Sequence, residues 1–198
     1  IWEASLLYMQ VDNDFKFEQI GNEAKYKNAR VFYFDGEFDF AQGQLNVLKE
    51  STSKMIANDA LQLSVMITDN YGLDSNYQAM LWFATAERLI EQHRYDSAFV
   101  LFDSIQINFP MHSLADEILF RKGKAMEQQG KWSAACDYYT DLLKFHSDDI
   151  LGDDALYRLA DIEENQLLNK EKALEYYKRL IIDFKGSLPQ LKTSNFLI

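Results

Sequence analysis

The side chains best suited to catalysis or metal binding in this sequence are three histidines and one cysteine. His93, His112 and His146 lie far apart and show no HExxH spacing, which would place two metal ligands on one helix face. Each stands near the expected end of a helix, so we predict surface or capping roles. Cys136 follows Ala135 on an expected packing helix and is predicted to be a buried structural thiol. As the only cysteine, it excludes an internal disulfide framework.

A cluster of aspartates invites comparison with a calcium site: Asp148, Asp149, Asp153 and Asp154. An EF-hand loop needs oxygen ligands at alternate positions, a central glycine and a closing glutamate, and this pattern is absent. Carboxylates at the start of a helix are stabilised by the helix dipole, each by about 0.3–1 kcal/mol. The cluster therefore predicts the beginning of a helix.

Two Gly-Lys pairs begin at Gly123 and Gly130, but neither belongs to a phosphate-binding loop. Both lack the upstream glycine and the following Ser or Thr that would bind phosphate and magnesium. Because no catalytic, cofactor or metal motif is found, we expect a protein that is not an enzyme, with no cofactor and no metal.

The composition favours a helical protein. Only two prolines and eight glycines occur in 198 residues, which suits long helices better than a turn-rich β fold. The formal net charge of −11 argues against nucleic acid and anionic membranes as partners. No run of about 18 apolar residues occurs, so no transmembrane segment is expected. A signal peptide or lipid anchor would precede Ile1, outside this sequence.

The helices needed to position these side chains are indicated by a spacing pattern that recurs at a period of about 37 residues. The stretch ADEILFRKGKAMEQ aligns with GDDALYRLADIEEN and, earlier, with YQAMLWFATAERLI. In the segments that follow, Ala98, Ala135 and Ala173 each precede an aromatic residue by four positions. Apolar residues recur every three or four positions, as in amphipathic helices, and the small residues fall where two helices must approach closely. We therefore predict paired helices, with Gly130 in a left-handed conformation between two of them and a capping box at Ser75 and Gln78.

These columns resemble the tetratricopeptide repeat. The unit from Ala79 to Pro110 has the family's order almost whole, and the later units depart from it at Lys122, Ser147 and Lys185. The resemblance implies an all-α fold, a right-handed α-solenoid of stacked helix-turn-helix repeats that spans residues 1–198 as a single array. The expected units are 1–19 (the second helix of a truncated repeat), 20–52, 53–74 (irregular), 75–111, 112–148 and 149–186, followed by a C-terminal extension at 187–198. In the first unit, Trp2, Leu6 and Leu7 are expected to lie partly exposed.

In this family the first helix of each pair lines a concave groove, so the resemblance also implies a binding site for a partner segment. The predicted partner-binding residues are Met80, Phe83, Glu87, Glu117, Phe120, Lys124, Asp154, Tyr157 and Asp161. Ile90, Glu91, Glu127, Gln128, Glu164 and Asn165 lie in the same columns. An aromatic row beside many carboxylates would suit a protein segment with apolar and basic residues. Alternatively, the aromatic rings pack into the next helix and the acids form a solvated face.

Three classes of function remain open. The favoured one is a protein–protein interaction scaffold or adaptor in a bacterial cell-envelope complex, on the periplasmic side. The junction NFPMHSLADEILFRKG resembles those of outer-membrane barrel-assembly lipoproteins and periplasmic cell-division coordinators. The second class is a cytoplasmic, co-chaperone-like module that grips a terminal carboxylate through Lys or Arg. The third, a helical-repeat enzyme domain, is disfavoured by the missing motifs.

Overall fold

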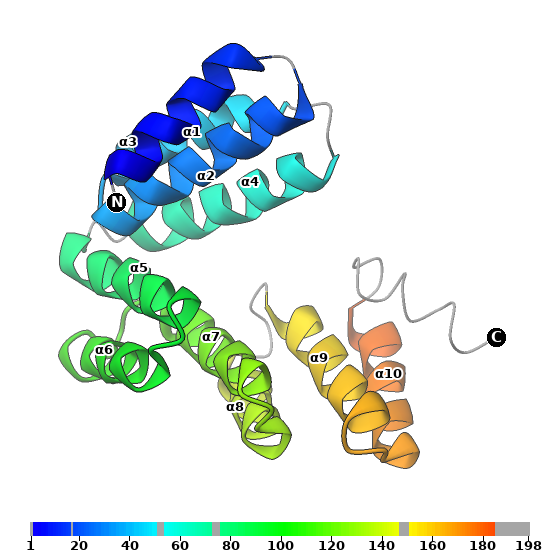
Figure 1. Cartoon of the computed structure of the whole chain (residues 1–198). Coiled ribbons are helices and arrows are strands. Elements are labelled where there is room, and N and C mark those ends of the chain that lie inside the picture. The colour runs from blue at the N-terminus through cyan, green and yellow to red at the C-terminus, as the bar shows by residue number, and fades with distance from the viewer. Residues whose placement is uncertain (1, 17, 51–53, 73–75, 147–150, 185–198) are drawn as a thin grey trace. The chain divides into compact units, whose positions relative to one another are not determined.

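A computed structural model describes residues 2–16, 18–50, 54–72, 76–146 and 151–184. Within these ranges the regular elements are all helical, and no strand occurs (Figure 1). The elements are α1 (Trp2–Asp14), α2 (Gln19–Asp35), α3 (Phe38–Leu48), α4 (Lys54–Ile67), the π-helical η1 (Thr68–Gly72), α5 (Tyr77–Glu91), α6 (Tyr95–Asn108), α7 (Ala115–Gln128), α8 (Trp132–Phe145), α9 (Gly152–Asn165) and α10 (Lys170–Asp183). The predicted all-α class of successive helix pairs is confirmed.

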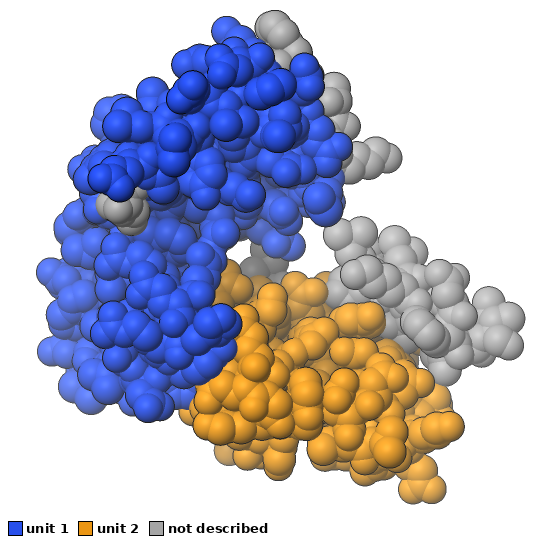
Figure 2. Space-filling model, in the orientation of Figure 1, with its two compact units in different colours: residues 1–113 blue, residues 114–198 orange. Residues whose placement is uncertain are grey.

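Contacts between helices divide the chain into two compact units, residues 1–113 and 114–198, which Figure 2 shows in different colours. In both units helices pack on their neighbours in the chain, as expected for a repeat. The single array over residues 1–198 and its individual boundaries stay a prediction.

The first unit begins with helices that pack in sequence, α1 on α2, α2 on α3 and α3 on α4. Ser5 of α1 donates a hydrogen bond to the Asn28 side chain of α2 at 2.7 Å, and Asn28 donates to Gln44 of α3 at 3.2 Å. This chain of bonds pairs polar groups that lie between the helices. Trp2 and Leu6 of α1 are 50% and 68% exposed, so their predicted partial exposure is confirmed; Leu7 is similarly exposed.

The helix pair α5–α6 shows how small and aromatic residues allow close packing. Ala86 of α5 and Ala98 of α6 are fully buried. The rings of Phe83 and Phe102 lie 5.5 Å apart between their centroids, also fully buried. The predicted close approach of these helices is therefore present. Tyr33 of α2 donates a hydrogen bond to Glu87 of α5 at 2.6 Å, where α2 and α5 pack together.

The second unit is a sequential stack in which α7 packs on α8, α8 on α9 and α9 on α10. Its core includes Tyr139 and Leu142 of α8 and Leu159 of α9, all fully buried. At Gly123 of α7, an added Cβ would lie 2.6 Å from the ring of Tyr139. Glycine therefore allows the ring of Tyr139 to approach α7 this closely.

The turns between paired helices share a left-handed residue at one position. Gly130 adopts φ 70° between α7 and α8, so its predicted conformation is confirmed. His93 between α5 and α6 and Leu168 between α9 and α10 adopt φ 58° and 55°. These two residues carry a Cβ and make the same turn at a higher conformational cost than glycine.

The cap at the start of α5 differs in position from the one predicted. The side chain of Asn76 accepts a hydrogen bond from the backbone N–H of Ala79 at 3.2 Å, so Asn76 is the capping residue. Ser75, the predicted cap, lies outside the described residues.

Candidate functional site

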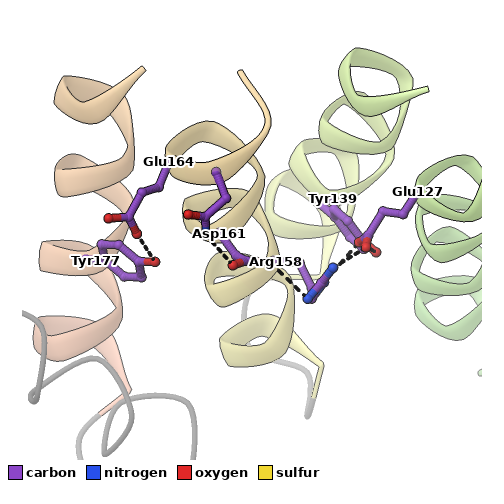
Figure 3. A network of polar contacts seen from close by, with 7 residues as sticks. Glu127, Tyr139, Arg158, Asp161, Glu164 and Tyr177 are labelled. Atoms are coloured by element: carbon purple, nitrogen blue, oxygen red, sulfur yellow. Dashed lines mark hydrogen bonds and ion pairs between the residues drawn. The ribbon is translucent and has the colours of Figure 1, made fainter. Parts of the chain in front are cut away.

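Two buried tyrosines of the second unit donate hydrogen bonds to glutamates of the preceding helix (Figure 3). Tyr139 of α8 donates to Glu127 of α7 at 2.5 Å, and Tyr177 of α10 donates to Glu164 of α9 at 2.9 Å. Burial raises the pKa of both tyrosines, and the hydrogen bond to the glutamate raises it further. Both hydroxyls therefore remain protonated at neutral pH, and each ties together the two helices of one pair.

The same two columns are apolar in the helix pair α5–α6. Ile90 and Phe102 occupy the places of the glutamate and the tyrosine, and both are buried. The hydrogen-bonded glutamate and tyrosine thus occur in α7–α8 and α9–α10, whereas the core of α5–α6 is apolar at both positions. The glutamate carboxylate brings negative charge to a partly buried position, and this charge needs a nearby cation to balance it.

Arg158 of α9 provides that compensation across neighbouring helix pairs (Figure 3). Its Nε donates to Glu127 Oε1 at 3.0 Å, its Nη2 pairs with Glu127 Oε2, and its Nη1 lies 3.2 Å from Asp161 Oδ2. The hydrogen bonds to Glu127, together with the charges of Glu127 and Asp161, raise the pKa of Arg158. Because a bidentate Arg–carboxylate pair is directional and strong, Arg158 fixes α9 against α7.

A pocket of about 280 Å³ opens beside this network. Its walls come from α7, the start of α8, α9 and the residue that follows α9. The lining residues are Lys124, Glu127, Gln128, Trp132, Arg158, Asp161, Ile162 and Gln166. Two cations, two carboxylates, two amides and two apolar side chains thus surround one small volume, and their formal charges cancel.

Lys124 is the cation of this pocket without an ion pair among the described residues. Its ammonium lies 5.5 Å from the centroid of the Phe120 ring. Desolvation in the pocket lowers the pKa of Lys124, and repulsion from Arg121 and Arg158 lowers it further. An anionic or strongly accepting group on a ligand would relieve both effects.

The structure places the predicted groove residues of α5 mostly inside the first unit. Met80 and Phe83 are fully buried, so their side chains support the helix pair and present no surface to a partner. Glu87 is half-buried and accepts the hydrogen bond from Tyr33.

In the second unit, the predicted residues divide between core and pocket. Phe120 is buried against Tyr139, with 5.6 Å between ring centroids, and Tyr157 is half-buried against the cluster of Ala160, Ala173 and Tyr177. Phe83 and Phe120 therefore follow the alternative interpretation of the aromatic row, in which the rings pack into the next helix. Of the charged residues, Lys124 and Asp161 meet in the pocket, while Glu117 and Asp154 are half-buried outside its lining.

Four lining residues were not in the predicted groove columns: Trp132, Arg158, Ile162 and Gln166. Arg158 left a signal in the sequence, because Arg121 occupies the same column one repeat earlier. Trp132 begins a second helix, three positions before Ala135, where the repeat spacing indicates packing between helices. Gln166 follows the end of α9, where a repeat alignment carries little information.

The remaining reactive side chains are accounted for locally. Cys136 is buried, as predicted, and burial together with the charge of Glu163 raises the pKa of its thiol to about 11. His93 is exposed and hydrogen-bonded to Tyr95 at 2.9 Å, whereas His112 is buried. Of the surface or capping role predicted for His112, the surface alternative is therefore wrong, and the capping alternative stays a prediction. His112 lies between α6 and α7, where its backbone N–H donates to the carbonyl oxygen of Phe109 at 3.0 Å. Asp153 lies in the first turn of α9 as expected, with its neighbour Asp154.

The described residues contain no group of three or more His, Cys, Asp or Glu side chains arranged to hold a metal ion. Nor does any described helix have both the length and the apolar character of a membrane span. Asp148 and Asp149, the first half of the aspartate cluster, lie outside the described residues.

Comparison with known proteins identifies two segments of the chain. Residues 117–149 and 154–187 match the family described as the tetratricopeptide repeat, and they correspond closely to α7–α8 and α9–α10. A search of curated proteins found no significant match. Tetratricopeptide repeats generally mediate protein–protein interaction and are typically non-enzymatic modules.

Proposed function

We propose that this chain, two segments of which match the tetratricopeptide repeat, is a non-enzymatic adaptor that binds a segment of another protein in the pocket of α7, α8 and α9. The observation that carries the proposal is this pocket, where Lys124 and Asp161, two of the predicted groove residues, meet. Its volume of about 280 Å³ is at the lower limit of small-molecule sites, which span about 300–1,000 Å³. It suits one or two side chains of a polypeptide.

The groups that remain available in the pocket match a peptide backbone and an apolar side chain. Glu127 is already paired with Tyr139 and Arg158, so it acts mainly as a support. The amide of Gln166 can donate to and accept from a main-chain amide, and the indole of Trp132 offers an N–H donor and an apolar face. An extended or helical segment with an apolar anchor on Trp132 would satisfy these groups.

The net charge of the chain and the carboxylates of α9 favour a partner with basic flanks. The chain carries a net charge of −11, and Asp154, Asp161 and Glu164 all lie on α9. Their attraction would act mainly on the rate and orientation of association, since Asp161 and Glu164 already accept hydrogen bonds within the unit.

One observation also favours the second class, a co-chaperone-like module that takes a terminal carboxylate. Lys124 projects a cation into the pocket without an ion pair among the described residues. A carboxylate at the end of a partner chain would pair with it. Comparing a captured segment with a free and with an amidated C-terminus separates the two: a preference for the free acid supports this second candidate.

The location that we propose is a bacterial cell-envelope complex on the periplasmic side. The support is the resemblance of the junction around Pro110 and Met111 to those of envelope proteins of this repeat family. Sequencing the complete gene tests it directly. A signal peptide upstream of Ile1, with or without a lipidated cysteine, is expected, and a cytoplasmic full-length protein would contradict it.

The binding site itself is tested by capture from the native organism followed by mass spectrometry. The wild-type chain is compared with Lys124→Glu and Trp132→Ala as pocket variants and with Lys131→Glu as a charge control. Lys131 is exposed and lies one residue before Trp132, outside the pocket lining. We expect a protein that is captured by the wild type and by Lys131→Glu but lost from both pocket variants. A partner retained equally by all four chains would place the interface elsewhere.

A further inference from the structure

An exposed row of aromatic rings lies across the first three helices of the first unit. Trp2 of α1 contacts Phe32 of α2 edge-on, with 5.6 Å between ring centroids, and Phe32 stacks on Phe40 of α3, also at 5.6 Å. Trp2 is 50% exposed and Phe40 is 65% exposed, while Phe32 is half-buried between them. We call these three residues the aromatic ridge. Contiguous apolar surface of this kind is typical of binding sites, whereas scattered exposed residues are common everywhere.

Four carboxylates lie close in sequence to the residues of the aromatic ridge. Glu3 and Asp39 are sequence neighbours of Trp2 and Phe40, Asp35 ends α2, and Glu37 lies in the turn that joins α2 to α3. Among the described residues, none of these four has an ion-pair partner.

Two cationic side chains of α2 form ion pairs with carboxylates outside this set of four. Lys25 pairs with Asp12 at 3.3 Å, and Arg30 pairs with Glu91. Glu3 and Asp39 stand in the first turns of α1 and α3, where the helix dipole stabilises them. Asp35 ends α2, where the dipole is unfavourable to a carboxylate, so the local fold does not explain the whole set.

From this charge complementarity we infer that the aromatic ridge is a second docking surface, separate from the pocket of α7–α9, and that its occupant is a basic amphipathic helix of another protein. Apolar side chains of that helix would cover Trp2 and Phe40, and its Lys or Arg residues would pair with these four carboxylates. A symmetric contact with a second copy would bring carboxylates against carboxylates. An anionic membrane would meet the same repulsion.

The inference is tested with a short fluorescein-labelled peptide of leucine and lysine, patterned as an amphipathic helix, titrated against the whole chain. Phe40→Ala should weaken its binding about tenfold, as expected for a central aromatic anchor. Asp39→Lys should weaken it comparably and reduce its salt dependence. In the ¹⁵N–¹H spectrum of the wild type, the indole signal of Trp2 should move and that of Trp132 should not, which separates this surface from the proposed function.

Matched controls come from α6 of the same unit. Asp96 is the second residue of α6, as Asp39 is of α3, and both are exposed; Val100 is 64% exposed, close to the value for Phe40. Asp96→Lys and Val100→Ala should leave binding within about twofold of the wild type. Circular dichroism of each variant confirms that the fold is retained.

Several results would overturn the inference. Equal weakening by Asp39→Lys and Asp96→Lys would mean that the peptide is attracted only by the net charge of the chain. Equally tight binding of a peptide with the same composition in scrambled order would mean the same. Preferential binding to neutral phosphatidylcholine vesicles would assign the ridge to a membrane. A wild-type dimer that Phe40→Ala dissociates would show that a second copy covers the ridge. Failure of the full-length protein to bind the peptide would show that another part of the same protein covers it.

Discussion

Replacing Gly123 by alanine should destabilise the second unit, although alanine is the better helix former. Gly123 lies within α7, and an added Cβ would stand 2.6 Å and 2.7 Å from two ring carbons of Tyr139. These separations are well below van der Waals contact. The ring has little room to withdraw, because Tyr139 is fully buried and its hydroxyl donates to Glu127 at 2.5 Å.

The magnitude follows from two opposing effects. Alanine in a helix interior is favoured over glycine by about 1 kcal/mol. Overpacking in a filled core typically costs about 1–3 kcal/mol. If the ring shifts enough to lose the hydrogen bond to the ionised Glu127, the loss is about 1.5–3 kcal/mol more. We therefore expect Gly123→Ala to lower the free energy of unfolding by about 1–2 kcal/mol.

Urea unfolding followed by circular dichroism measures this change, and the next repeat supplies a control. Ala160 occupies the same column, is fully buried and packs against Tyr177 and Ala173. There the alanine already fits, so Ala160→Gly should also destabilise, by about 1 kcal/mol through lost helix propensity and a lost methyl contact. A Gly123→Ala variant more stable than the wild type by about 1 kcal/mol would show that Tyr139 does not constrain α7, and the packing argument would be refuted.

Three further predictions concern turns, packing and pH. Leu168→Gly should stabilise by about 1 kcal/mol in thermal unfolding because φ at Leu168 is left-handed, whereas Gly130→Ala should destabilise by about the same amount; two changes of one sign would contradict this. Ala98→Leu should cost about 1–3 kcal/mol by overpacking, against less than about 0.5 kcal/mol for Gln92→Leu on the exposed surface; equal urea midpoints would mean that the repeat register is wrong. Because the thiol pKa of Cys136 is about 11 in the folded chain and 9.0 when unperturbed, the unfolded state loses the proton first. The free energy of unfolding should therefore fall as the pH rises through this interval, and Cys136→Ala should remove that part of the fall.

The features predictable from the sequence were those that depend on spacing along one helix or one turn. Ala98 and Ala135 mark the close contacts between paired helices because only a small residue fits there. Gly130 could be identified because a left-handed turn favours a residue without a Cβ. Both signals are local, and both recur with the repeat.

The site was only partly predictable because its contacts join distant parts of the chain. The bond from Arg158 to Glu127 spans 31 residues and depends on how α9 lies against α7, which spacing within a helix does not determine. The groove columns placed Phe83 and Phe120 on the first helices of their pairs, but their burial depends on the angle at which Phe102 and Tyr139 meet them. The net negative charge of the chain also gave no indication of a pocket in which the charges of the lining cations and carboxylates balance.

The central claim, that a partner segment binds the pocket of α7–α9, is tested most directly by the three tryptophan indole signals of the ¹⁵N-labelled chain. Trp132 lines the pocket, Trp2 lies on the aromatic ridge, and Trp82 packs against Phe109 at 5.7 Å between ring centroids as an internal reference. The partner found by capture is titrated into the wild type and into Lys124→Glu. We predict that the Trp132 signal moves in a saturable manner, that the Trp82 signal stays in place, and that Lys124→Glu abolishes the movement. Saturable binding that leaves the Trp132 signal unmoved would contradict the claim.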